Sequence, residues 1–254
     1  MFNKKWLPSP FFKSRGNYPL NMIIIHHIGS SKGKLYSVKG TLIWFTNIDV
    51  HKNPATGKIE NKVSAHYVLP REKHDGNDIY HLVKDTDIAY HAGVSQWTIN
   101  DKLRKYINRY SIGIEMEGDG NLVEYTDYQY DVLTWVVKDL MYQYNIKEEN
   151  IVGHEDIAPK RKVDPGKFFD WKKFRTMLNP PIIISTEPNS TEITPIPTEN
   201  HKLSQAPPKN VKPPITVPTE EKEFFMEDGS KTYGGFMQIV LNILMFLLGK
   251  AKNP

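Results

Sequence analysis

Apolar and polar residues along the first half of the chain follow the spacing of β-strands. The stretch NMIIIHH at 21–27 is apolar until its two histidines, which is typical of a strand buried on both faces. KVSAHYVL at 62–69 alternates, so every second apolar side chain shares one face. The stretches IYHLV at 79–83 and YSIGIEME at 110–117 predict two further strands.

Helical spacing is clearest in the segment that opens with TDYQ. Thr126 as N-cap and Gln129 three residues later form a capping box. Apolar residues then recur at helical intervals: Val132, Leu133, Val136, Val137, Leu140 and Tyr144. Residues 36–47 suit a second helix, and 146–157 a short strand or loop. Because strands and helices interleave, we expect an α/β domain with a single mixed β-sheet flanked by helices.

Proline content changes sharply near the end of this domain. Ten of the 18 prolines lie between Pro180 and Pro218, among threonine, serine, glutamate and asparagine. Proline lacks a backbone donor, and few large apolar side chains are present, so this stretch predicts an extended linker. We expect a folded domain at 1–179, a disordered linker at 180–222 and a C-terminal segment at 223–254.

The C-terminal segment is apolar at 236–248 except for Gln238 and Asn242, which would share one face of a helix. This run is shorter than the roughly 20 residues that cross a bilayer. Three interpretations remain open: a helix lying in or on a membrane, self-association through the polar pair, or docking on the folded domain.

Composition excludes several kinds of site. The chain has no cysteine, so disulfides, thiolate nucleophiles and cysteine-based zinc sites are excluded. Any zinc must be held by histidine and carboxylate.

Residues 1–180 contain 26 basic and 21 acidic side chains, a formal charge of +5. This charge is too small to indicate a nucleic-acid partner. It suits an acidic polymer such as the cell wall and equally an ordinary solvated surface.

Two histidines end the first predicted strand. Adjacent side chains of a strand point to opposite faces, so at most one of His26 and His27 can be a metal ligand. A histidine bonded in the core beside a surface histidine explains this stretch equally well.

A second polar cluster lies in GHEDIAPKRKVDPG at 153–166. His154 precedes a basic loop, and the turn signal Asp-Pro-Gly would fix the direction of Asp164. An extended backbone would project Lys162 and Asp164 to the same side, whereas Lys160 and Arg161 read as solvated.

The strand SIGIEMEG places Glu115 and Glu117 on one face. Two carboxylates on one face suggest a general base. A solvated or salt-bridged pair of glutamates is, however, the commoner explanation of such spacing.

Several motifs together resemble one family. SAHYVL, YHAGVS, SIGIEMEG, YTDYQY and GHEDIAPKRKVDPGKFFDW are similar to the zinc-dependent N-acetylmuramoyl-L-alanine amidases, whose superfamily includes phage amidases and peptidoglycan-recognition proteins. The resemblance runs from about Leu7 to Leu178. It is strongest to the branch of cytoplasmic amidases that recycle anhydro-muropeptides.

The resemblance implies roles for particular residues. The implied zinc ligands are His26, His154 and Asp164. Glu115 matches the catalytic carboxylate and Lys162 the lysine beside the third ligand. Glu117 becomes a supporting residue, and His91 resembles part of a substrate groove. Many phage relatives use a cysteine as third ligand, which this chain lacks.

The implied reaction is hydrolysis of the amide between N-acetylmuramic acid and L-alanine in peptidoglycan or muropeptides. The tail favours a phage-type endolysin in host lysis. Residues 1–20 lack the apolar stretch of a secretory signal, so we expect a host-cytoplasmic protein acting at the cell wall. The alternatives are a cytoplasmic anhydro-muropeptide recycling amidase and a non-catalytic peptidoglycan-binding module. The filled ligand positions argue against the binding module.

Overall fold

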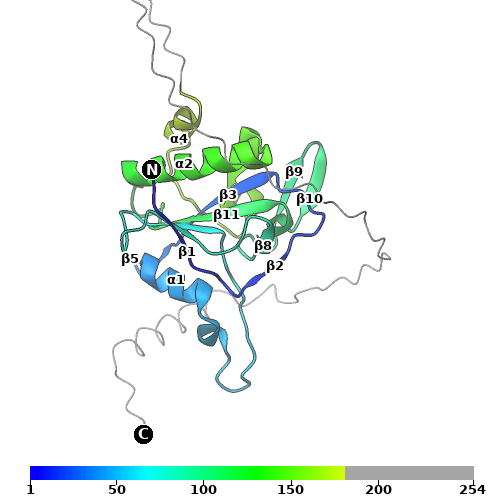
Figure 1. Ribbon diagram of the computed structural model, residues 1–254, viewed down its shortest axis with the longest axis vertical. Coiled ribbons are helices and arrows are strands. Elements are labelled where there is room, and N and C mark those ends of the chain that lie inside the picture. The colour runs from blue at the N-terminus through cyan, green and yellow to red at the C-terminus, as the bar shows by residue number, and fades with distance from the viewer. Residues whose placement is uncertain (181–254) are drawn as a thin grey trace, which may run out of the picture. The chain divides into compact units, whose positions relative to one another are not determined.

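A six-stranded mixed sheet forms the centre of residues 1–180, the part of the chain that the computed structural model describes (Figure 1). Its strands, in spatial order, are β1 (Lys4–Trp6), β7 (Ile79–His81), β6 (Tyr67–Leu69), β11 (Ser111–Met116), β3 (Met22–His27) and β12 (Ile151–Gly153). Only β6 and β7 pair antiparallel within it, and the other neighbours are parallel. The predicted α/β class with one mixed sheet and flanking helices is confirmed.

Shorter elements surround this sheet. Three two-stranded pairs are β2 (Phe12–Ser14) with β8 (Asp87–Ala89), β4 (Ser30–Ser31) with β5 (Lys34–Leu35), and β9 (Gln96–Ile99) with β10 (Lys102–Lys105). The helices are α1 (Val38–Thr46), α2 (Asp127–Tyr144), α3 (His154–Ile157) and α4 (Trp171–Leu178). Single 3₁₀ turns are η1 (Ile48–His51), η2 (Ile107–Arg109) and η3 (Glu148–Asn150).

One face of the sheet packs against α2. Its strands contribute Ile23, Ile25, Ile112 and Ile114, whose side chains alternate with those of the opposite face and share a buried cluster with Leu133 of α2. The predicted capping box begins this helix. The Thr126 hydroxyl accepts from the Gln129 backbone N–H at 3.1 Å, and the Gln129 side chain accepts from the Thr126 N–H at 3.2 Å.

The other face has two smaller apolar clusters. Helix α1 covers Val68 and Tyr80 near one end of the sheet. The second cluster surrounds Ile24. It includes Ile107 from η2 and Val152 from β12. The central strands β3 and β11 carry His26 and Glu115 on this same face, because both alternate with the residues that face α2.

The alternating stretch at 62–69 forms a strand only over Tyr67–Leu69, so that prediction was too long. The Ser64 hydroxyl donates to the carbonyl of Phe11 at 2.5 Å, and the Ser64 N–H bonds to the carbonyl of Tyr90 at 3.2 Å. These contacts draw the first half of the stretch away from the main sheet. The strand β1, which the pattern did not predict, is exposed and basic.

Across residues 1–180, no helix combines the length and the apolar character needed to cross a bilayer. The predicted linker and apolar C-terminal helix lie outside the described residues.

Candidate metal centre

Three neighbouring parallel strands bring polar residues to one edge of the sheet. His26 is the penultimate residue of β3 and pairs across the ladder with Glu115, the penultimate residue of β11. On the other side of β3, Gly153 ends β12 opposite Ile25, so His154 follows at the level of His26. The carboxyl ends of parallel strands meet at a common edge, where ligand sites of α/β sheets usually lie.

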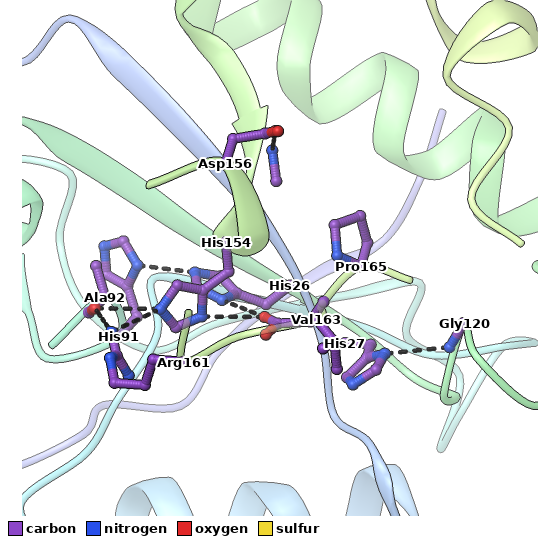
Figure 2. Close-up of polar contacts among 12 residues, drawn as sticks. His26, His27, His91, Ala92, Gly120, His154, Asp156, Arg161, Val163 and Pro165 are labelled. Atoms are coloured by element: carbon purple, nitrogen blue, oxygen red, sulfur yellow. Dashed lines mark hydrogen bonds and ion pairs between the residues drawn. The ribbon is translucent and has the colours of Figure 1, made fainter. Parts of the chain in front are cut away.

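Three ligand atoms from distant parts of the chain converge at this edge. Nδ1 of His26 lies 2.9 Å from Oδ2 of Asp164, and Nδ1 of His154 lies 3.1 Å from the same oxygen (Figure 2). All three atoms lie within 4.8 Å of one another, and the three residues are buried. The structure thus brings together the side chains that the resemblance implied as ligands.

The outer ring nitrogen of His154 shows how this cluster suits a cation. Its Nε2 lies 3.1 Å from the carbonyl oxygen of Ala92, which can only accept a hydrogen bond. Nη2 of Arg161 also lies 3.4 Å from this nitrogen, but its two N–H groups donate to the carbonyls of Ala92 and Val94. Nε2 therefore carries the ring proton, and the lone pair of Nδ1 faces the carboxylate of Asp164. Two lone pairs that face each other in a buried site favour a positive ion between them.

The protonation states of the cluster also suit a metal. Burial and the neighbouring His154 together lower the pKa of His26 to about 4, against the opposing effect of Asp164. Two imidazoles and one carboxylate are a donor set found in catalytic zinc sites with three protein ligands.

The backbone around Asp164 is fixed on both sides. Its carbonyl accepts from the Glu155 N–H at 2.9 Å, and the carbonyl of Pro165 accepts from the Tyr125 hydroxyl at 2.8 Å. A Cβ on Gly120 would lie 1.9 Å from that Pro165 oxygen, so no larger residue fits there. This close packing directs the Asp164 side chain toward the two imidazoles.

Glu115 and Glu117 have different environments. Burial raises the pKa of Glu115 well above its ordinary value, the charge of Asp164 raises it further, and Lys162 opposes the shift. A carboxyl group with a raised pKa is a stronger proton acceptor than an ordinary glutamate. Glu117 instead accepts from the N–H groups of Val38 at 2.8 Å and Arg71 at 2.9 Å. It anchors the start of α1, as expected of a supporting residue.

His27 points away from the cluster, as strand geometry predicted. Its Nδ1 accepts from the Gly120 N–H at 3.1 Å (Figure 2). Asp119 lies 3.6 Å from the same nitrogen. Only His26 of the two adjacent histidines therefore faces the site.

Arg161 is exposed, as expected for this basic loop, but it also contacts the backbone beside the site. Its guanidinium donates to the carbonyls of Ala92 at 2.7 Å and Val94 at 2.9 Å, and it packs over Gly93. The sequence shows a run of basic residues here. It does not show that backbone carbonyls from a distant segment lie within reach of Arg161.

His91 lies beside His26, at the ring nitrogen that faces away from Asp164 (Figure 2). Its Nδ1 is 2.9 Å from Nε2 of His26, and its Nε2 is 3.2 Å from the hydroxyl of Ser111. Asn108 supports the same segment, since its side-chain oxygen accepts from the N–H groups of His91 and Ala92. Sequence reasoning singled out neither Ser111 nor Asn108, although Ser111 opens the motif SIGIEMEG.

Comparison with known proteins agrees with this geometry. The N-acetylmuramoyl-L-alanine amidase family matches residues 16–167. The 1,6-anhydro-N-acetylmuramyl-L-alanine amidase AmpD of Escherichia coli K12 is 35% identical over 175 residues, covering 68% of this chain and 91% of AmpD. The N-acetylmuramoyl-L-alanine amidase AmiD of the same organism is 35% identical over 147 residues, covering 54% of this chain and 51% of AmiD.

A solved structure shares the fold. The crystal structure of a selenomethionine derivative of AmpD aligns with a TM-score of 0.58 at 33% identity, covering 70% of this chain and 96% of that chain.

Proposed function

This chain belongs to the family of zinc-dependent N-acetylmuramoyl-L-alanine amidases, and we propose that its substrates are soluble anhydro-muropeptides. The similarity to AmpD, which spans 91% of that enzyme, carries this proposal, because AmpD is named for the 1,6-anhydro sugar. The bond cleaved joins the lactyl carbonyl of the muramyl sugar to L-alanine. As the resemblance implies for a recycling enzyme, the proposed compartment is the cytoplasm.

The proposed metal ligands are His26, His154 and Asp164, whose donor atoms converge within 4.8 Å. Zinc bound there supplies Lewis-acid chemistry, which polarises a carbonyl and lowers the pKa of water toward roughly 7. The buried carboxylate and the imidazole proton positions keep these three side chains ready to receive a cation before substrate arrives.

Glu115 is the proposed proton carrier. It lies on the strand next to His26, and its raised pKa suits a group that takes a proton from the attacking water. The same carboxyl group then protonates the departing nitrogen of L-alanine.

Lys162 is half-buried, and its charge acts on Glu115. Its ammonium group is proposed to stabilise the negative charge that develops on the lactyl oxygen. The products are a muramyl sugar with a free lactyl carboxylate and a peptide that begins with L-alanine.

Release of peptide amino groups from three substrates tests the proposal: an anhydro-muropeptide, the same muropeptide with a reducing sugar, and intact sacculi. We expect kcat/KM to be highest for the anhydro-muropeptide, by at least about tenfold, which corresponds to roughly 1.4 kcal/mol of transition-state discrimination. A preference for intact sacculi would contradict it.

Two variants serve as controls in the same assay. Glu115→Gln should retain zinc and lose turnover by about 10²- to 10⁴-fold, the usual contribution of a general acid–base. Asp164→Ala should lose zinc and activity together. Parental turnover in Glu115→Gln would show that another group carries the proton.

A second candidate is a lytic role on the intact wall. It is supported by the proline-rich sequence after residue 180 and the apolar run at 236–248, which suit a tethered enzyme. The test compares the full chain with a protein that lacks residues 181–254. If the full chain lyses cells or sacculi, and the shorter protein loses lysis but still cleaves soluble muropeptides, the lytic role is favoured over recycling.

A further inference from the structure

The two candidate imidazole ligands turn their outer nitrogens toward one dipeptide, His91–Ala92 (Figure 2). Nε2 of His154 meets the carbonyl of Ala92 at 3.1 Å, and Nε2 of His26 meets the ring of His91 at 2.9 Å. A carbonyl has no proton to give, so it sets the tautomer of His154 directly. The ring of His91 can either give or accept a proton, and its own partner therefore decides the tautomer of His26.

That partner is Ser111, which ends the chain of hydrogen bonds at a backbone carbonyl. Its hydroxyl lies 2.8 Å from the carbonyl oxygen of Ile107 and 3.2 Å from Nε2 of His91. Because the carbonyl only accepts, the single hydroxyl proton of Ser111 goes to Ile107. The hydroxyl oxygen then accepts from Nε2–H of His91, and Nδ1 of His91 accepts from Nε2–H of His26.

We propose that Ser111 and His91 are positioning residues that hold the proton of His26 on Nε2 and direct its Nδ1 lone pair toward the metal. This inference rests on the proposed metal site, since it assigns the support of one ligand. An imidazole that binds a cation through Nδ1 keeps its proton on Nε2, and that proton needs an acceptor. His91 supplies this acceptor at a site where His26 itself is buried.

The surrounding structure holds His91 in this position. The side-chain oxygen of Asn108 accepts from the N–H of His91 at 3.1 Å and from the N–H of Ala92 at 2.7 Å. The ring lies against Gly113 in β11, where an added Cβ would come within 2.4 Å of the ring carbon Cγ. The glycine leaves room for the imidazole between the strand and His26.

Zinc affinity of three variants tests this role. His91→Phe keeps an aromatic ring against Gly113 and removes both ring nitrogens. We expect it to weaken zinc binding by about 10- to 100-fold, the usual effect of removing a hydrogen-bond partner of a metal ligand. His91→Gln retains one acceptor and one donor and should recover a large part of the affinity. Ser111→Ala should weaken binding less than His91→Phe. Chelator competition measures each dissociation constant, with His74→Phe as the control far from the site.

Nuclear magnetic resonance gives a readout independent of activity. Long-range ¹H–¹⁵N correlations of the zinc-loaded protein report which ring nitrogen of each histidine bears the proton. We expect Nε2–H on both His26 and His91, and a mixture of His91 tautomers in Ser111→Ala. The proposal is overturned by Nδ1–H on His91 in the parental protein or by equal zinc affinity in His91→Phe. Equal losses in His91→Phe and His91→Gln would also overturn it, since they would indicate ring packing alone.

Failure of the metal site itself gives a different result. If the parental protein and His154→Ala bind zinc equally, the proposed ligand set is wrong. If the parental protein binds zinc, His154→Ala does not, and His91→Phe binds zinc as tightly as the parental protein, the ligand set stands and the support by His91 does not.

Discussion

His66 shows how strongly burial acts on a single side chain in this protein. Its ring is fully buried, accepts from the Gly113 N–H at 3.0 Å and lies 3.2 Å from the carbonyl of Asp87. Burial, together with the positive charge of Arg15, lowers the pKa of His66 to about 3. The neutral ring thus connects three segments and has a structural role.

At the scale of single residues, we expect the free energy of unfolding to depend on pH through His66. The folded pKa of about 3 lies below the ordinary value of 6.5, so the unfolded chain binds this proton first as pH falls. The stabilisation is complete above pH 6.5 and is lost as pH falls toward 3. We expect a slope of about 1.4 kcal/mol per pH unit from this one group between those values. Denaturant unfolding of metal-free parental and His66→Gln protein at pH 4 to 7 should show a shallower dependence in the variant. Equal slopes would mean that burial does not hold His66 neutral.

At the scale of elements, strand register and helix capping place the site. The pairing of Glu115 with His26 depends on a register in which β11 and β3 present alternate residues to the same face. A slip of one residue in either strand would turn its polar side chain toward α2, into the apolar cluster around Ile25 and Leu133. Helix α2 opposes such a slip, because its apolar face packs against the other side of both strands.

The capping box of α2 offers an element-scale prediction. Thr126→Ala removes the hydroxyl that accepts from Gln129 and that donates to the carbonyl of Arg71. We expect the free energy of unfolding to fall by about 1 kcal/mol, the typical cost of losing an N-cap. Thr46→Ala, which removes a hydroxyl at the end of α1, is the matched control and should cost less. Chemical denaturation measures both, and equal losses would argue against a special contribution of the cap.

At the scale of the whole molecule, residues 1–180 hold the sheet, its covering helices and every proposed site residue. The family match at 16–167 lies within this range. The ligand atoms join positions up to 138 residues apart in sequence, so the site depends on the complete domain and not on a local motif.

Removal of residues 181–254 is therefore predicted to leave the chemistry intact. The truncated protein should bind zinc and cleave soluble muropeptides with a kcat/KM within about threefold of the full chain, a difference below 1 kcal/mol. Thermal unfolding provides the control for folding of the shorter protein. A folded, zinc-loaded truncation that lacks activity would place part of the site in the removed segment.

Local pattern was sufficient for much of this fold. The two-residue period of a strand separated His26 from His27, and capping chemistry located the start of α2 at Thr126. These features depend only on neighbouring residues, so they can be read without the fold. The resemblance added His154 and Asp164 as partners of His26, because an ordered motif carries information that periodicity lacks.

Tertiary structure alone decided how the ligands are supported. The Ser111 hydroxyl, the Asn108 amide and the carbonyl of Ala92 became relevant only when β11, η2 and the segment before β9 met behind the imidazoles. The backbone contacts of Arg161 and the short length of β6 also became apparent only in the folded structure. A hydrogen bond between distant segments depends on where the folded backbone places its carbonyls and N–H groups, and no periodicity of side chains records that position.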